Sequence, residues 1–155
     1  MKKTITTLCI ILLAGSFGYS QTSSAPANQN SKADSVAIEK TANNYVEGFY
    51  NGDATRVGSA VHPELVKRII YKDNTGNAMI QNMGASGLIF AAVKHKKADP
   101  NPSEPFKATV TIYDIFNETA TVKIVTNKFD FIDYAQMAKI AGEWKIINVL
   151  WANTH

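Results

Sequence analysis

Apolar side chains recur at helical spacing near the start of the folded part of the chain. Across residues 34–51 they return every three or four positions, which predicts a helix with one buried face. Asp34 or Ser35 can cap its first turn, and Asn51-Gly52 ends it because glycine accepts the left-handed conformation that follows a helix. The buried face consists of Ile38, Ala42, Tyr45, Val46 and Phe49.

A second helix and a hairpin are expected next. Asp53 can cap a short helix, which His62-Pro63 closes. Residues 66–71 are rich in β-branched and aromatic side chains, and the turn-forming run "DNTGN" separates them from a second apolar stretch. The pattern therefore predicts a hairpin within residues 65–83.

A third helix and four strands complete the chain. Ser86 is expected to cap the helix, and the charged, proline-rich loop "KHKKADPNPSEP" ends it. From residue 107 the apolar period changes to two, with a turn at residues 117–119. The last two strands are expected at residues 129–140 and 144–152, hinged at residues 141–143. The predicted order is α-α-β-β-α-β-β-β-β, and a helical part followed by an antiparallel meander belongs to the α+β class.

The N-terminal segment is interpreted as an export signal. Residues 1–20 combine Lys2 and Lys3, a short apolar run, and small residues at Gly18 and Ser20 that suit signal peptidase. The apolar run is shorter than the ~20 residues that span a bilayer. Cys9 lies inside that run and not after the small-residue site, so we expect no lipid anchor and a periplasmic or secreted protein. The polar residues 21–33 are predicted to be a flexible tether, and residues 34–155 a single domain.

Charge and composition exclude several function classes. Removal of residues 1–20 takes away two lysines and no acidic residue, so the formal net charge falls from +3 to +1. This balance gives no electrostatic reason to expect nucleic acid or a membrane surface as a partner. The chain lacks a paired histidine motif, and its only cysteine lies in the signal segment, so we expect no metal and no cofactor.

Four segments carry a resemblance to a known family. They are "YVEGFYNGD" (45–53), "VHPEL" (61–65), "DIFNETATVKI" (114–124) and "FIDYAQMAKIAGEWKIINVLW" (131–151). In this order and spacing the chain resembles the putative lumazine-binding family of the nuclear-transport-factor-2-like superfamily, which includes SnoaL-like and ketosteroid-isomerase-like proteins. The resemblance implies a curved antiparallel sheet wrapped around three helices as a cone with an internal pocket. Since that superfamily contains isomerases, dehydratases and binding proteins, the fold does not determine the function.

Aromatic residues are the candidates to line such a pocket. Their rings can stack on a flat ligand, and a hydroxyl or indole N–H can orient it. Each of them has an alternative role as an ordinary core residue. The candidate ligand-binding residues are Tyr45, Phe49, Tyr71, Phe131, Tyr134 and Trp151.

The catalytic candidates are Asp133 and His62. Asp133 and Tyr134 are adjacent in a predicted strand, so only one of them can face the pocket unless a bulge intervenes, and Asp130 shares the face of Tyr134. Asp133 can serve as a carboxylate in an apolar pocket, or it can satisfy neighbouring donors within the sheet. His62 can act as a general acid or base, or it can cap the last carbonyls of the second helix. His95 lies at a lysine-rich helix end.

Three functions fit these observations. The favoured hypothesis is an exported, non-catalytic protein that binds a small aromatic or apolar ligand in the cone. The second is an isomerase or dehydratase that uses an Asp or His together with a Tyr. The third is a dimerising interaction module, because the outer strand face carrying Thr109, Thr111, Tyr113 and Lys123 is mixed in polarity, which suits a moderate homodimer interface.

Overall fold

The computed structural model describes residues 32–95 and 103–155. The predicted signal segment and most of the predicted tether lie outside the described residues. Within them the element order is the predicted one, and the α+β class is confirmed. The helices are α1 (Lys32–Asn51), α2 (Ala54–Ala60) and α3 (Ala85–Lys94); the strands are β1 (Val61–Lys72), β2 (Ala78–Gly84), β3 (Ala108–Phe116), β4 (Thr119–Thr126), β5 (Phe131–Ile140) and β6 (Glu143–Asn153).

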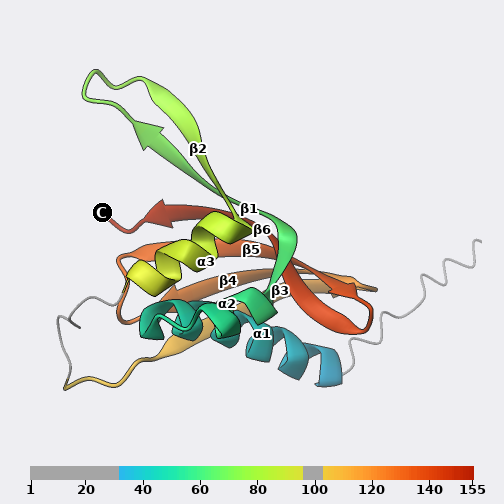
Figure 1. The fold of residues 1–155 in the computed structure, drawn as a ribbon. Coiled ribbons are helices and arrows are strands. Elements are labelled where there is room, and N and C mark those ends of the chain that lie inside the picture. The colour runs from blue at the N-terminus through green and yellow to red at the C-terminus, as the bar shows by residue number, and fades with distance from the viewer. Residues whose placement is uncertain (1–31, 96–102) are drawn as a thin grey trace, which may run out of the picture.

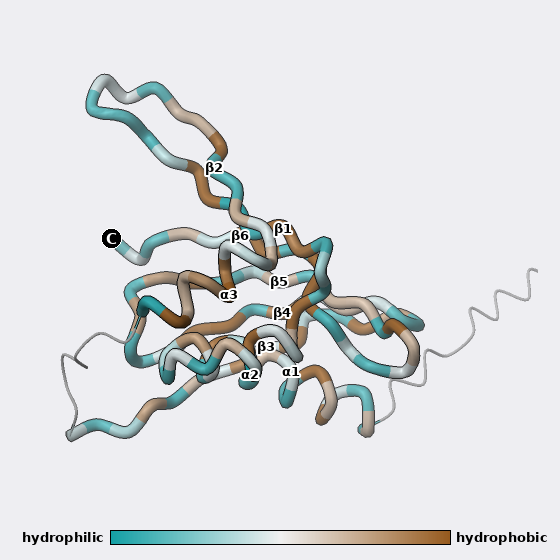
Figure 2. The backbone as a smooth tube through the Cα atoms, viewed as in Figure 1, coloured by the Kyte–Doolittle hydropathy of each residue, from teal (hydrophilic) through white to brown (hydrophobic). Residues whose placement is uncertain are grey.

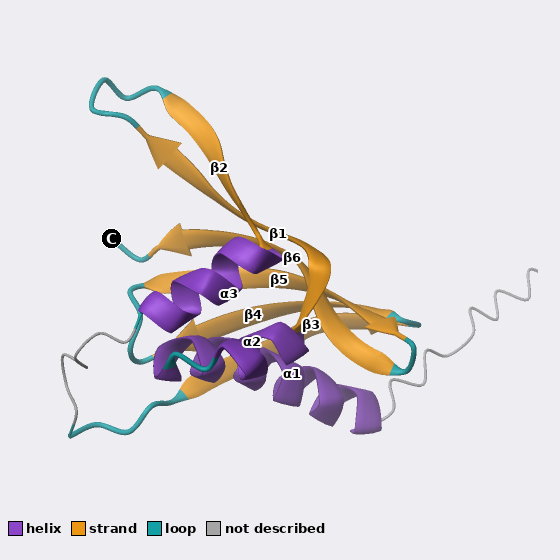
Figure 3. Cartoon of the chain, viewed as in Figure 1, coloured by secondary structure: helices purple, strands orange, loops and turns teal. Residues whose placement is uncertain are grey.

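The six strands form one curved sheet with the helices on one of its faces (Figures 1 and 3). The strand order is β2-β1-β6-β5-β4-β3. Neighbouring strands are antiparallel except β1 and β6, which run parallel. Strand β1 thus joins the hairpin to the C-terminal strand, and the end of the β1–β2 hairpin extends away from the helices (Figure 1).

The core lies between the helices and the concave face of the sheet. The turn of the β1–β2 hairpin is hydrophilic, whereas hydrophobic stretches follow the strands beneath the helices (Figure 2). On β5 the burial alternates as the period of two requires: Asp133, Ala135 and Met137 are buried, and Tyr134 and Gln136 are exposed. One face of the meander is therefore interior, and the other is open to solvent.

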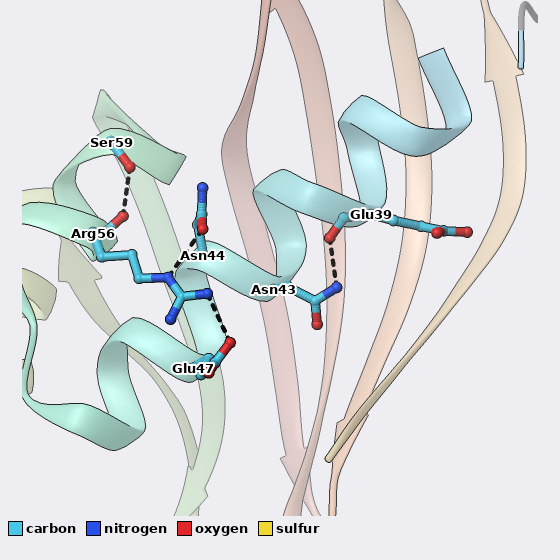
Figure 4. A network of polar contacts seen from close by, with 6 residues as sticks. All are labelled: Glu39, Asn43, Asn44, Glu47, Arg56 and Ser59. Atoms are coloured by element: carbon cyan, nitrogen blue, oxygen red, sulfur yellow. Dashed lines mark hydrogen bonds and ion pairs between the residues drawn. The ribbon is translucent and has the colours of Figure 1, made fainter. Parts of the chain in front are cut away.

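A polar network fixes the two N-terminal helices to each other (Figure 4). The Arg56 guanidinium on α2 donates to the Asn44 side-chain oxygen at 3.0 Å and to the Glu47 carboxylate at 2.7 Å, both on α1. Asp53 caps α2, as predicted, by accepting the backbone N–H of Arg56 at 2.9 Å. Gly52 has the expected positive φ of 71° in the connection between the helices.

The structure corrects three predicted boundaries. Helix α1 starts at Lys32, so the last two residues of the predicted tether are helical. Helix α2 ends at Ala60, and His62 already lies in β1, because a residue before proline is driven to extended conformation. The residue that caps α3 is Gly84 and not Ser86, since β2 pairs with β1 up to Gly84 and the chain enters the helix at once.

No helix in the described ranges is long and apolar enough to cross a membrane.

The turn between β5 and β6 generates a stability prediction. Ala141 and Gly142 both have positive φ, 51° and 83°, as in a two-residue hairpin turn that favours Asn-Gly. We expect Ala141→Asn to raise the free energy of unfolding by roughly 0.5–1 kcal/mol, because asparagine tolerates this conformation better than alanine. Urea denaturation measures the change. Gly142→Ala is the matched opposite: a Cβ there meets no atom within 4 Å, so any loss of stability comes from the backbone conformation. A lower stability of Ala141→Asn would contradict this reading.

Candidate functional site

A cavity of about 190 Å³ lies between the helices and the concave face of the sheet. Its aliphatic wall comes from α1, α3 and β2 through Val46, Leu88, Ala91 and Met83. Five aromatic residues form the rest of the apolar wall, and two charged residues complete the lining. These residues are Tyr45, Phe49, Phe129, Phe131 and Trp151, with Lys67 and Asp133.

The polar groups of the cavity form a closed ring of hydrogen bonds. The Lys67 ammonium donates to Asp133 Oδ1 at 2.5 Å and to the Tyr45 hydroxyl oxygen at 2.7 Å. The Tyr45 hydroxyl in turn donates to Asp133 Oδ2 at 2.9 Å. The side chains of Lys67 and Asp133 are 8% and 1% exposed, so this is a buried ion pair with a buried hydroxyl attached to both members.

Sheet register brings these residues together from distant parts of the sequence. Lys67 on β1 pairs with Val149 on β6, and Asp133 on β5 pairs with Trp151, two residues further along β6. Residues two apart on a strand point to the same face. Lys67 and Asp133 therefore reach toward each other across β6 on the concave face, and Tyr45 meets them from α1.

Aromatic rings surround the ammonium group. The Lys67 nitrogen lies 5.0 Å from the ring centroid of Trp151, 5.1 Å from that of Phe131 and 5.4 Å from that of Tyr45. All three distances fall within the ~6 Å range of cation–π attraction. Phe129 stacks on Phe131 with centroids 5.0 Å apart and an interplanar angle of 6°. The rings partly replace the water that the buried cation has lost.

Burial dominates the titration of this group. Desolvation lowers the pKa of Lys67 below its ordinary value, although the charge and hydrogen bond of Asp133 oppose that shift. Desolvation also raises the pKa of Tyr45 well above its ordinary value, and the Asp133 carboxylate adds to the increase. Tyr45 is therefore a neutral donor at physiological pH.

The structure places four of the six aromatic candidates in the cavity. Tyr45, Phe49, Phe131 and Trp151 line it. Tyr71 and Tyr134 lie outside it and are 49% and 41% exposed. Tyr71 is on the extending hairpin, and Tyr134 occupies the outer face because β5 alternates regularly there.

Of the polar candidates, Asp133 lies in the cavity, whereas His62 and Asp130 lie outside it. Asp133 is buried in the cavity, and it satisfies buried donors as well, so the two roles considered for it coexist. His62 does not line the cavity. Its Nδ1 accepts a hydrogen bond from the backbone N–H of Glu64 at 3.2 Å. This contact lies within β1, so His62 does not cap the second helix. The carboxylate of Asp130 is 84% exposed, with His155 at 3.5 Å.

Sequence reasoning missed three residues of this region. The strand pattern of residues 66–71 gives no reason to single out Lys67, although it stands two positions after the buried Leu65 and thus on the same face. Phe129 was not proposed as a lining residue, although it precedes Phe131 by two positions. His95 packs against the cavity wall, with its ring centroid 4.7 Å from that of Phe49 and 5.4 Å from that of Phe129.

The described ranges contain no cluster of three or more histidine, cysteine or acidic side chains that could hold a metal ion.

The buried ion pair generates a second stability prediction. Lys67→Met leaves the Asp133 carboxylate buried without its cation, and we expect a loss of about 3–5 kcal/mol in the free energy of unfolding. Lys67→Met/Asp133→Asn removes both charges and keeps an acceptor for Tyr45, so it should recover much of that loss. Urea denaturation of both variants measures the difference.

An exposed ion pair provides the control. Glu143 lies 2.8 Å from the Lys145 nitrogen with its side chain 71% exposed, so Glu143→Gln should change stability by less than about 1 kcal/mol. The assignment of a buried ion pair is wrong if Lys67→Met costs no more stability than this control.

Comparisons with solved structures place the fold. A protein of unknown function from Shewanella baltica OS155, described as NTF2-like, has 20% identity and a TM-score of 0.61, over 77% of this chain and 93% of that one. An NTF2-like protein of unknown function from Methylobacillus flagellatus KT has 19% identity and a TM-score of 0.62, over 80% and 94%. A putative scytalone dehydratase from Novosphingobium aromaticivorans DSM 12444 has 14% identity and a TM-score of 0.52, over 79% and 85%. At these identities the likeness shows a common fold, which is nuclear-transport-factor-2-like.

A family comparison is more specific. No curated protein matches the chain in sequence. The sequence model of the family described as "Putative lumazine-binding" matches residues 33–152, which include every residue that lines the cavity. The chain therefore belongs to the putative lumazine-binding family, with a nuclear-transport-factor-2-like fold.

Proposed function

We propose that the protein is an exported, non-catalytic binding protein whose cavity takes a small aromatic ligand that carries a hydrogen-bond acceptor. The observation that carries this proposal is the Lys67-Asp133-Tyr45 ring, set in a cavity whose other lining residues are apolar. A ligand cavity with few polar groups uses those groups to orient its ligand.

The size and shape of the cavity favour a flat ligand. Its volume is about 190 Å³, and an apolar cavity of about 150 Å³ in another protein accepts benzene. One or two fused rings therefore fit. The edge-to-face pair of Phe131 and Trp151, with centroids 5.3 Å apart, and the adjacent Phe129 offer ring surfaces against which such a ligand can pack.

The ammonium group favours an acceptor atom on that ligand. An ammonium has three N–H donors. Lys67 directs two of them to Asp133 and Tyr45, which leaves one for a ligand within the described part of the chain. A carbonyl oxygen or a ring nitrogen with a free lone pair meets this requirement. Lumazine, after which the family is named, is a two-ring heterocycle with carbonyl oxygens, so it supports the same ligand class.

A thermal-shift screen tests the binding proposal. We expect lumazine or a related pteridine, flavin fragment or bicyclic carbonyl compound to raise the melting temperature of the wild-type protein. Phe131→Leu should weaken binding about 2- to 13-fold, because it removes an aromatic contact worth roughly 0.5–1.5 kcal/mol. Isothermal titration calorimetry measures the affinities.

Tyr134 supplies the matched control on the same strand. It is three positions from Phe131 but on the outer face, so Tyr134→Leu should leave the affinity unchanged. Absence of any stabiliser in a broad panel of aromatic metabolites, or equal effects of the two substitutions, would count against a ligand site in the cavity.

An isomerase or dehydratase is the second candidate, because Asp133 and Tyr45 both reach the cavity. It ranks below binding because both Asp133 oxygens already accept hydrogen bonds, one from Lys67 and one from Tyr45, so neither oxygen is unpaired in the cavity. Conversion of a bound ligand to an isomer or dehydrated product, observed by NMR and lost in Asp133→Asn with affinity retained, would favour this enzyme.

Export and homodimerisation are further parts of the proposal. Export rests on residues 1–20, and N-terminal sequencing of the protein from a secreting host should begin at Gln21.

Dimerisation is supported by the outer sheet face, where four large apolar or aromatic side chains are 37–56% exposed: Tyr113, Tyr134, Ile147 and Leu150. Light scattering should give twice the monomer mass; a monomer at high concentration would refute it.

A further inference from the structure

We propose that Lys67 captures small aromatic aldehydes and ketones in the cavity as a reversible covalent imine. The inference rests on the proposed binding function and adds a chemical step to it. Among the described residues that line the cavity, Lys67 is the one with a primary amine. The carbonyl group that its nitrogen can orient by hydrogen bonding is also the group with which an amine condenses.

The position of Lys67 suits this reaction. Its nitrogen lies 5.0–5.4 Å from three ring centroids in the cavity wall, so an aromatic ligand that packs there presents its substituent close to the amine. The backbone of Lys67 is held by pairing on both sides, with Met83 of β2 and Val149 of β6. The amine itself is held by hydrogen bonds to Asp133 and Tyr45, so it is positioned before the ligand arrives, which reduces the entropic barrier to attack.

Asp133 supplies the proton transfers. It lies 2.5 Å from the Lys67 nitrogen and can take one ammonium proton, which leaves a neutral amine beside a neutral acid. Removal from water costs the Lys67 ammonium hydration free energy, which favours release of a proton from its nitrogen. The lowered pKa of Lys67, which arises mainly from burial, agrees with such a transfer.

The balanced reaction needs no other reagent. The neutral amine forms a C–N bond to the carbonyl carbon as the C=O π bond breaks, and one proton passes from that nitrogen to the oxygen to give a neutral carbinolamine. Asp133 returns its proton to the hydroxyl, the C–O bond breaks, and water leaves as the nitrogen lone pair forms the C=N bond. The ammonium and the carbonyl compound thus become a protonated imine beside the Asp133 carboxylate and one water, with no oxidation or reduction. Tyr45, which donates to Asp133 at 2.9 Å, holds the carboxyl group in place for both transfers.

The surface lysines lack these features. Lys139 lies 2.8 Å from Asp34 with its side chain 33% exposed, and it stands outside the cavity. An imine formed there is open to water and hydrolyses, whereas the apolar wall around Lys67 restricts the access of water. Capture should therefore be selective for one lysine.

Borohydride trapping tests the proposal. The full-length mature protein is incubated with benzaldehyde and sodium cyanoborohydride, and the product is analysed by intact mass and peptide mapping. We expect a single benzyl group on Lys67, added at least ten-fold faster than on any other lysine. Lys67→Arg keeps the cation but cannot form an imine, and it should abolish the fast addition; Lys139→Arg should not change it.

Benzyl alcohol tests ligand binding without covalent capture, so it distinguishes a failure of this inference from a failure of the proposed function. It has the same ring and an oxygen acceptor but no carbonyl, so it should raise the melting temperature and slow the trapping at Lys67 in the wild-type protein. That protection uses no variant, so the test holds even if Lys67→Arg folds poorly.

Two outcomes overturn the proposal. If benzyl alcohol binds but benzyl groups spread over surface lysines at similar rates, covalent capture is wrong and the binding proposal stands. If neither compound shifts the melting temperature and Lys67 is not preferred, capture is wrong and the ligand proposal also loses its support for this class of compound.

Discussion

The buried contact between the Lys67 ammonium and the Asp133 carboxylate is the constraint on which the cavity depends. Each charge is stable inside the protein only because the other is present, and the Tyr45 hydroxyl bonds to both. The three side chains come from β1, β5 and α1. A change in the relative position of the helix and the two strands therefore breaks a charged hydrogen bond, which ties the shape of the cavity to electrostatics as well as to packing.

The aromatic residues serve this ion pair and the cavity at once. Phe131 and Trp151 face the ammonium and also form the wall against which a ligand can pack. A ring that attracts a cation also attracts the faces and edges of other rings. The same few residues thus stabilise a buried charge and form the cavity wall, so Asp133 is at once a partner of that charge and a lining residue.

Local patterns predicted much of the fold. The period of two on β5 placed Asp133 and Tyr134 on opposite faces, and the cap at Asp53 followed from its neighbours. Lys67 was missed for a physical reason. A lysine in a strand is most often exposed, and its burial is compensated by Asp133, 66 positions away, through a parallel pairing of β1 with β6 that no local pattern encodes. Tyr71 was misplaced because the hairpin leaves the body of the sheet, which alternation alone does not reveal.

That parallel pairing also has a consequence for folding. Strand β6 is the last element, yet it lies between β1 and β5 in the sheet. It reaches β5 through a two-residue turn, whereas the β1 residue Arg68 contacts Asn148 of β6 across a separation of 80 residues. Long-range strand pairing forms more slowly than a hairpin. We therefore expect Lys67 to lose its hydration and meet Asp133 only when β1 joins the edge of β6 that the β5–β6 hairpin leaves open.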